Sequence, residues 1–163
     1  MSDAAFGEMR PIGVIRSPFK GLKGMPIQPA GADGVVGTIE VYPEFVEGLL
    51  DLDGFSHIIL LYAFSESKGY DAVVTPFMDA APHGVFATRA PRRPNPIGLS
   101  VVRLMSMDEG VLHIENVDVL DGTPLLDIKP HVPKFIPDGP VRVGWLAPAH
   151  DSVVQRRSDD RFL

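Results

Sequence analysis

The sequence predicts a mainly β protein: a small single-domain β-barrel with short helices and long loops. Short runs rich in β-branched and aromatic residues recur along the 163 residues, and such runs are typical of strands. Gly and Pro, 16 of each, punctuate these runs, as in barrels and sandwiches. Helical and strand segments do not alternate, which disfavours a doubly wound sheet. The chain shows no internal repeat or linker, and its length fits one domain.

Three strands and a short helix are expected in the N-terminal half. Residues 11–17 (PIGVIRS) form the first strand candidate, followed by a long loop rich in Gly and Pro over 19–34. Loops of that length are often functional. Residues 35–41 predict a second strand, and 42–50 a short helix, because a proline near its start precedes apolar residues at helical spacing. The most apolar segment, 55–64, predicts a buried central strand.

A loop over 65–83 and three strands are expected next along the chain. Residues 85–88 predict a short strand that ends at a cluster of arginines. Residues 99–107 and 111–117 predict a hairpin around Asp-Glu-Gly, and the glycine supplies the positive φ that a three-residue hairpin loop prefers. Four apolar side chains of this hairpin are expected to share one buried face: Val102, Leu104, Leu112 and Ile114.

The last strand expected is a short one over 125–128, stopped by Pro130 and Pro133. The tail over 142–163 predicts one weak helix.

Composition excludes several kinds of chemistry. The chain has no cysteine, which excludes disulfides, thiolate zinc sites, a cysteine nucleophile and cysteine-ligated iron–sulfur clusters. The N-terminus lacks the pattern of a secretory signal, and the longest apolar stretch, 58–63, is too short to span a bilayer. We therefore expect a cytoplasmic protein without a membrane segment. The five histidines are far apart and form no metal-binding motif, so no metal is expected.

The charge distribution leaves two interpretations open. A formal net charge of −6 argues against a general nucleic-acid binder, since phosphate contacts need Lys and Arg. However, Arg89, Arg92 and Arg93 lie close together in the sequence. They form either a local basic mouth on an acidic protein or a solvated loop.

The first candidate binding segment is residues 86–98. It alternates proline with arginine and asparagine, and proline fixes φ and removes backbone donors, so the loop is stiff before any ligand arrives. Such preordering lowers the entropic cost of binding. Arg89, Arg92 and Arg93 offer fork-shaped donors for carboxylates or phosphates, and Gly98 permits close approach of the backbone. We therefore favour a functional loop over a loop with incidental charge.

The second candidate segment is residues 120–130. Its Asp-Gly-Thr-Pro sequence at 121–124 predicts a turn, in which Asp121 can accept from backbone donors two residues on. Asp121 and Asp127 supply acceptors, while Arg89 and Arg93 of the first segment supply donors. A zwitterionic ligand with ribose hydroxyls needs both.

These segments and their surroundings resemble the TsaA-like, or TrmO, family. The matching pieces are Ile12–Pro18 (IGVIRSP), Gln28–Pro29 (QP), Gly54–His57 (GFSH), Gly84–Arg89 (GVFATR), Arg93–Gly98 (RPNPIG) and Asp121–Pro130 (DGTPLLDIKP). The resemblance covers residues 10–136, with 137–163 as a C-terminal extension of the same domain. It implies a barrel of the TsaA-like type that binds S-adenosyl-L-methionine, usually as a homodimer. It also implies N6-methylation of threonylcarbamoyladenosine at position 37 of tRNA.

By resemblance, the cofactor contacts would come from Pro26, Ile27, Gln28, His57, Ile58, Arg89, Leu99, Asp121, Gly122, Thr123 and Pro124. Two residues depart from the family pattern: Ile27 stands where many members carry Arg, and His131 where many carry Tyr. A backbone contact at residue 27 would survive the first change, whereas a side-chain contact would not. From its place in an apolar strand, His57 is either a core histidine or a ligand contact.

The implied reaction needs no nucleophilic side chain, because the sulfonium already activates the methyl group. An acceptor for the proton of the adenine amine should help, and Asp121, Asp127 and His57 are candidates that the sequence leaves open. Two alternative functions also remain. Some family members carry an additional C-terminal domain that this chain is expected to lack, which together with the acidic charge suggests a methyltransferase for a small molecule or protein. The absence of an obvious base suggests a non-catalytic S-adenosyl-L-methionine sensor.

Overall fold

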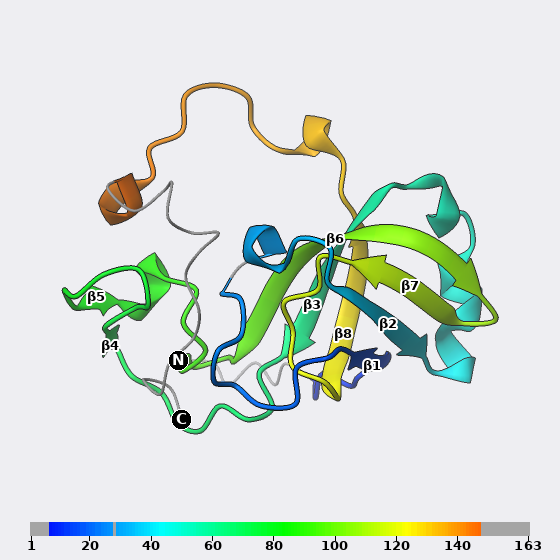
Figure 1. Cartoon of the computed structure of the whole chain (residues 1–163), viewed down its shortest axis with the longest axis horizontal. Helices are drawn as coiled ribbons and strands as arrows, with labels where there is room; N and C mark the ends of the chain where they lie inside the picture. Colours follow the sequence, from blue (N-terminus) through cyan, green and yellow to red (C-terminus); the bar gives the residue numbers. More distant parts are fainter. Residues whose placement is uncertain (1–6, 28, 148–163) are drawn as a thin grey trace.

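Six strands form one closed antiparallel barrel in the computed structural model of the protein, which describes residues 7–27 and 29–147 (Figure 1). The order around the barrel is β1-β2-β7-β6-β3-β8. The barrel strands are β1 (Gly13–Arg16), β2 (Val36–Val41), β3 (His57–Ala63), β6 (Ile97–Asp108), β7 (Val111–Glu115) and β8 (Thr123–Pro130). The predicted mainly β barrel is therefore confirmed.

The barrel interior is filled by alternate residues of each strand. In β3, Ile58, Leu60 and Tyr62 are buried, whereas the intervening residues face outward, as the two-residue period of a strand requires. The four apolar residues expected to share a face in the β6–β7 hairpin are all buried, and Leu104 lies opposite Ile114. Each fully buried aliphatic side chain contributes roughly 1.5–3 kcal/mol to the free energy of folding. The core thus holds β3 and β6, the two strands that carry the site, in fixed register.

The β6–β7 hairpin turns through two residues rather than the three expected. Asp108 pairs with Val111, and both intervening residues have positive φ, 44° at Glu109 and 86° at Gly110. Positive φ at both positions defines a turn whose twist matches that of the strands. The 3-10 helix η2 (Pro43–Leu49) confirms the short helix expected over 42–50. It packs near the turn, because a side chain at Gly110 would meet Val46 of this helix.

The strand predicted over 85–88 is wrong. Val85–Ala87 forms a 3-10 turn, η4, preceded by the short strand β5 (His83–Gly84). The carbonyl of Val85 accepts hydrogen bonds from the backbone N–H of Thr88 at 3.1 Å and from its hydroxyl at 2.9 Å. Such local side-chain bonding offers the backbone an alternative to a strand ladder. β5 pairs with β4 (Val73–Val74), inside the segment expected to be only loop.

The last barrel strand is longer than the expected 125–128. β8 includes Pro124 near its start and Pro130 as its final residue, positions at the ends of the strand where a missing backbone donor costs least. Other 3-10 segments are η1 (Pro29–Ala32), η3 (Leu52–Gly54) and η5 (Pro133–Phe135).

The C-terminal tail arches from β8 over the barrel and returns beside the β4–β5 pair (Figure 1). It carries a short helical turn at 144–147, where the ring of Trp145 stacks on His83 with 4.3 Å between centroids. The indole N–H also donates to the carbonyl of Ala87 at 2.9 Å. The rest of the helix predicted over 142–163 lies outside the described residues. Within residues 7–27 and 29–147, no helix has the length and apolar character needed to cross a membrane.

Substituting Gly98 by alanine should destabilise the barrel. Gly98 is buried opposite Tyr62 in the β3–β6 pairing, and a Cβ at this position would overlap the tyrosine ring. The rigid ring must move, so we expect the free energy of unfolding to fall by about 1–3 kcal/mol in urea denaturation. Gly21→Ala is the control, because nothing lies within 4 Å of the position that its new methyl group would take and its φ is not positive. Equal stability of the two variants would contradict the prediction.

Candidate functional site

A cavity of about 1000 Å³ opens where β3 ends and β6 begins. Its walls come from the ends of these strands, the η4 loop, the β7–β8 connection and the turn at 144–147. Apolar side chains dominate the walls, among them Phe77, Phe86, Leu99 and Trp145. A largely apolar cavity of this size suits an organic ligand held by a few polar groups.

Three polar side chains form a hydrogen-bonded chain in the cavity wall. The hydroxyl of Ser100 donates to Oδ1 of Asp118 at 2.6 Å, and the hydroxyl of Tyr62 lies 3.0 Å from Ser100 Oγ. A serine hydroxyl has a single hydrogen, which here is directed to the carboxylate, so Tyr62 donates to Ser100. Ser100 and Tyr62 are 1% and 6% exposed, so the surrounding core holds these hydrogen-bonded side chains in place. Asp118 and Tyr62 also line the cavity.

Burial shapes the ionisation of this chain. Burial raises the pKa of Asp118 to about 6, partly offset by the hydrogen bond from Ser100 and the positive charge of Arg89. The pKa of Tyr62 is raised by burial and by the negative charge of Asp118, so the phenol stays protonated. Asp118 therefore changes its charge close to neutral pH.

The three clustered arginines have three different roles. Arg93 shapes the loop: its Nη1 donates to the carbonyls of Val85 at 3.3 Å, Thr88 at 2.9 Å and Ala90 at 3.1 Å. Arg92 forms an ion pair with Asp71 at 2.6 Å. Arg89 lines the cavity, and its charge acts on Asp118. The cluster is therefore neither a uniform basic mouth nor a merely solvated loop.

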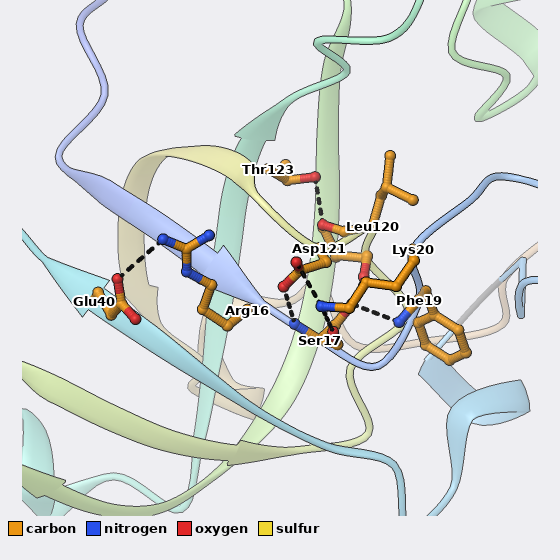
Figure 2. Close-up of polar contacts among 9 residues, drawn as sticks. Arg16, Ser17, Phe19, Lys20, Glu40, Leu120, Asp121 and Thr123 are labelled. Atoms are coloured by element: carbon orange, nitrogen blue, oxygen red, sulfur yellow. Dashed lines mark hydrogen bonds and ion pairs between the residues drawn. The ribbon is translucent and has the colours of Figure 1, made fainter.

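Asp121 does not line the main cavity, and its carboxylate bonds to Ser17 and Lys20 (Figure 2). Its Oδ1 accepts from the backbone N–H of Ser17 at 3.0 Å, and its Oδ2 lies 2.7 Å from Nζ of Lys20. The Lys20 hydrogen bond is the main reason that the pKa of Asp121 is lowered. The expected bond to a donor two residues on is thus replaced by bonds to the segment that follows β1. Asp121 lines a second, shallower pocket with Arg16 and Lys20.

The structure brings together only some of the residues expected to contact the cofactor. Five of them line the main cavity: Pro26, Ile27, Arg89, Leu99 and Thr123. Asp121, Gly122 and Pro124 belong to the same connection as Thr123 but do not line that cavity. Gln28 lies outside the described residues. Two stretches far apart in the sequence, 86–98 and 120–130, therefore still meet at one cavity, through Arg89, Gly98, Leu120 and Thr123.

His57 and Ile58 lie at the opposite end of β3 from the cavity. The six-residue separation of His57 from Ala63 corresponds to roughly 20 Å of extended strand. His57 is exposed, with Nδ1 2.9 Å from the hydroxyl of Ser56 and its ring 6.4 Å from that of His131. It is thus not a core histidine. Ile58 is fully buried in the barrel, so its side chain has no access to a ligand.

Sequence reasoning missed Asp118, Ser100 and Tyr62. One signal was available: Asp118 stands between Val117 and Val119, both of which are buried. A carboxylate between two core residues is held close to the core, and such positions often carry shifted pKa values.

The closed barrel and its apolar cavity with a polar, ionisable wall define a β-barrel protein whose cavity has room for an organic ligand of nucleotide size. The family model described as the tRNA-methyltransferase O N-terminal domain matches residues 14–136. The chain therefore belongs to the tRNA-methyltransferase O (TrmO) family, as its motifs indicated.

Several relatives support this assignment. A probable S-adenosyl-L-methionine-binding protein of Pyrococcus abyssi is 55% identical over 94% of this chain and 84% of its own length. A tRNA (adenine(37)-N6)-methyltransferase of Escherichia coli is 37% identical over 88% of this chain and 66% of its own length. The crystal structure of TrmO from Pseudomonas aeruginosa superimposes with a TM-score of 0.69 at 42% identity, over 85% of this chain and 62% of that one. This chain thus spans less than two thirds of the solved TrmO chain.

Proposed function

We propose that this chain binds S-adenosyl-L-methionine in the main cavity and methylates N6 of threonylcarbamoyladenosine at position 37 of tRNA. The cofactor and the methyltransferase class are supported by the family and by relatives named for both. The name of the Escherichia coli relative supports N6 of adenine 37 of a tRNA as the acceptor, and the threonylcarbamoyl group rests on the family resemblance. The observation that carries the proposal is the convergence of Arg89, Leu99 and Thr123 on one cavity, because the family resemblance assigns all three to the cofactor.

The residues present fit such a ligand. The apolar walls suit an adenine ring and methylene groups, and the guanidinium of Arg89 suits the carboxylate of the amino-acid portion. When bound, the cofactor supplies an activated methyl group. The protein's part is to align donor and acceptor and to exclude water, and alignment alone can lower a barrier by about 7–11 kcal/mol.

Methyl transfer can be tested directly. Purified protein with methyl-labelled S-adenosyl-L-methionine should label tRNA that carries the threonylcarbamoyl group, and should leave the same tRNA without that group unlabelled. Calorimetry with the cofactor alone shows in parallel that binding is intact. Cofactor binding without label in any tRNA pool would overturn the proposed acceptor.

The acidic net charge of −6 disfavours binding to nucleic acid, so a small molecule or a protein is the alternative class of acceptor. Nuclease treatment of a labelled cell extract separates the two, because label in a protein or small molecule survives it and label in tRNA does not. A non-catalytic sensor would bind the cofactor but form no S-adenosyl-L-homocysteine with any acceptor.

We also propose that two copies associate into a homodimer. The resemblance assigns His57 to the cofactor site, yet His57 lies at the far end of β3 from the cavity, so a second copy is needed to bring it there. The tail also exposes large apolar side chains, with Phe135 79% and Val141 78% exposed. Light scattering should give twice the chain mass. Mixed Arg89→Ala and His57→Ala subunits should regain activity that neither variant has alone, and no regain would argue against a shared site.

A further inference from the structure

Asp118 occupies a fixed position on the cavity wall that cofactor binding by Arg89, Leu99 and Thr123 does not explain. Its neighbours Val117 and Val119 are 0% and 3% exposed, so its backbone is anchored in the barrel core. Ser100 holds Oδ1 at 2.6 Å, and Tyr62 holds Ser100 in turn. One oxygen of the carboxylate is therefore fixed from beneath, and the residue lines the cavity.

The charged and titratable groups around Asp118 favour a proton acceptor. Arg89 acts on it electrostatically, and its own negative charge raises the pKa of Tyr62. Glu66 and Arg93 are the other ionisable side chains among the described residues that line the cavity. A carboxylate whose pKa lies at about 6 is ionised at neutral pH, yet is far more basic than one at its ordinary value of 3.8. General bases work best when their pKa lies near the working pH.

The bases suggested by the sequence are less well placed. Asp121 is held by Ser17 and Lys20, and its pKa is lowered. Asp127 forms an ion pair with Lys129 at 2.8 Å and does not line the cavity. His57 lies at the opposite end of β3 from the cavity of its own chain, and reaches a cavity only in the proposed homodimer.

We propose that Asp118 is the base that accepts the proton of the acceptor nitrogen during methyl transfer, held in place by Ser100 and Tyr62. The inference rests on the proposed function. The N–H bond breaks and its proton passes to Asp118, leaving an electron pair on nitrogen for the new bond to the methyl carbon. The electron pair of the C–S bond passes to sulfur, so that the sulfonium becomes a neutral thioether. Asp118 ends as a carboxylic acid and releases its proton to water before the next turnover.

Asp118→Asn tests this role, because the amide oxygen still accepts from Ser100 while the base is lost. Using the acceptor that takes up label, we expect kcat to fall about 10²- to 10⁴-fold. The Kd for S-adenosyl-L-methionine, measured by calorimetry, should not change. Asp108→Asn, an exposed change of the same kind at the β6–β7 turn, should leave both values unaltered.

The pH profile separates a base from a structural residue. In the unmodified chain, kcat should rise with pH through an inflection near 6, and ¹³C NMR of the ligand-free protein should show one carboxyl titrating there. Both signals should vanish in Asp118→Asn. Ser100→Ala removes a hydrogen bond that favours the ionised form, so it should move the inflection to higher pH.

Each other outcome overturns the proposal. Unchanged kcat in Asp118→Asn, with the unmodified chain active on tRNA, refutes the base while leaving the proposed function intact. Weaker cofactor binding with unchanged kcat identifies Asp118 as a cofactor ligand instead. No transfer by the unmodified chain to any acceptor refutes the proposed function and the base together.

Discussion

Arg89→Ala is expected to weaken S-adenosyl-L-methionine binding by about 1.5–3 kcal/mol, the usual value of a hydrogen bond to a charged group. This corresponds to roughly a 10- to 150-fold rise in Kd. The guanidinium lines the main cavity, and its charge reaches both Asp118 and Tyr62, so it lies where an anionic part of the ligand would be held. Calorimetric titration of the purified variant measures the change.

Arg103→Ala is the matched control for this experiment. It removes the same charge at a residue of β6 that does not line the main cavity; Arg103 is 53% exposed and pairs with Glu115 at 3.2 Å. Exposed pairs of this kind contribute only about 0–1 kcal/mol to folding, so the variant should fold and bind the cofactor normally. If Arg89→Ala binds as tightly as Arg103→Ala, Arg89 is not a cofactor ligand.

The barrel was predictable because its strands depend on local pattern and burial. Alternate residues of the apolar run at 55–64, namely Ile58, Leu60 and Tyr62, lie in the core with the hairpin residues Leu104 and Ile114. The strand predicted over 85–88 is wrong because of a local hydrogen bond, which a pattern of apolar and β-branched residues does not reveal. There, Thr88 bonds back to Val85 and bends the chain into a turn before it can pair.

The site was only partly predictable because its chemistry depends on contacts between distant segments. Tyr62, Ser100 and Asp118 are far apart in sequence and meet through the register that sets Tyr62 opposite Gly98, two residues before Ser100. The motif at 121–124 reaches the main cavity only through Thr123, and its aspartate bonds to Ser17 and Lys20 of another segment. A motif names the residues of a site, whereas the pairing of strands decides which of them face the ligand.

Asp118→Asn is expected to stabilise the ligand-free protein at neutral pH by about 2–3 kcal/mol, following the difference between the ordinary carboxyl pKa of 3.8 and about 6 in the fold. Below pH 3.8 the carboxyl of Asp118 is protonated in both the folded and the unfolded chain, so it does not lower the free energy of unfolding. As the pH rises to about 6, the unfolded chain loses its proton first, and the folded state becomes relatively less stable. Above about pH 6, the buried charge lowers the free energy of unfolding by its full amount, and asparagine, which carries no charge, avoids this loss.

Urea denaturation at about pH 7.5 and about pH 4 should show this pattern, with a clear gain for Asp118→Asn at the higher pH and little difference at the lower. A gain of this size corresponds to roughly 4–12 °C in Tm for a chain of this length. Asp79 and Asp121 have lowered pKa values and lose their stabilising effect on acidification, but they do so equally in both proteins. The difference between the two proteins therefore isolates Asp118. A variant less stable than the unmodified chain at neutral pH would show that the carboxylate contributes to folding. A variant more stable but far less active would show that the barrel tolerates a costly charge because methyl transfer needs it.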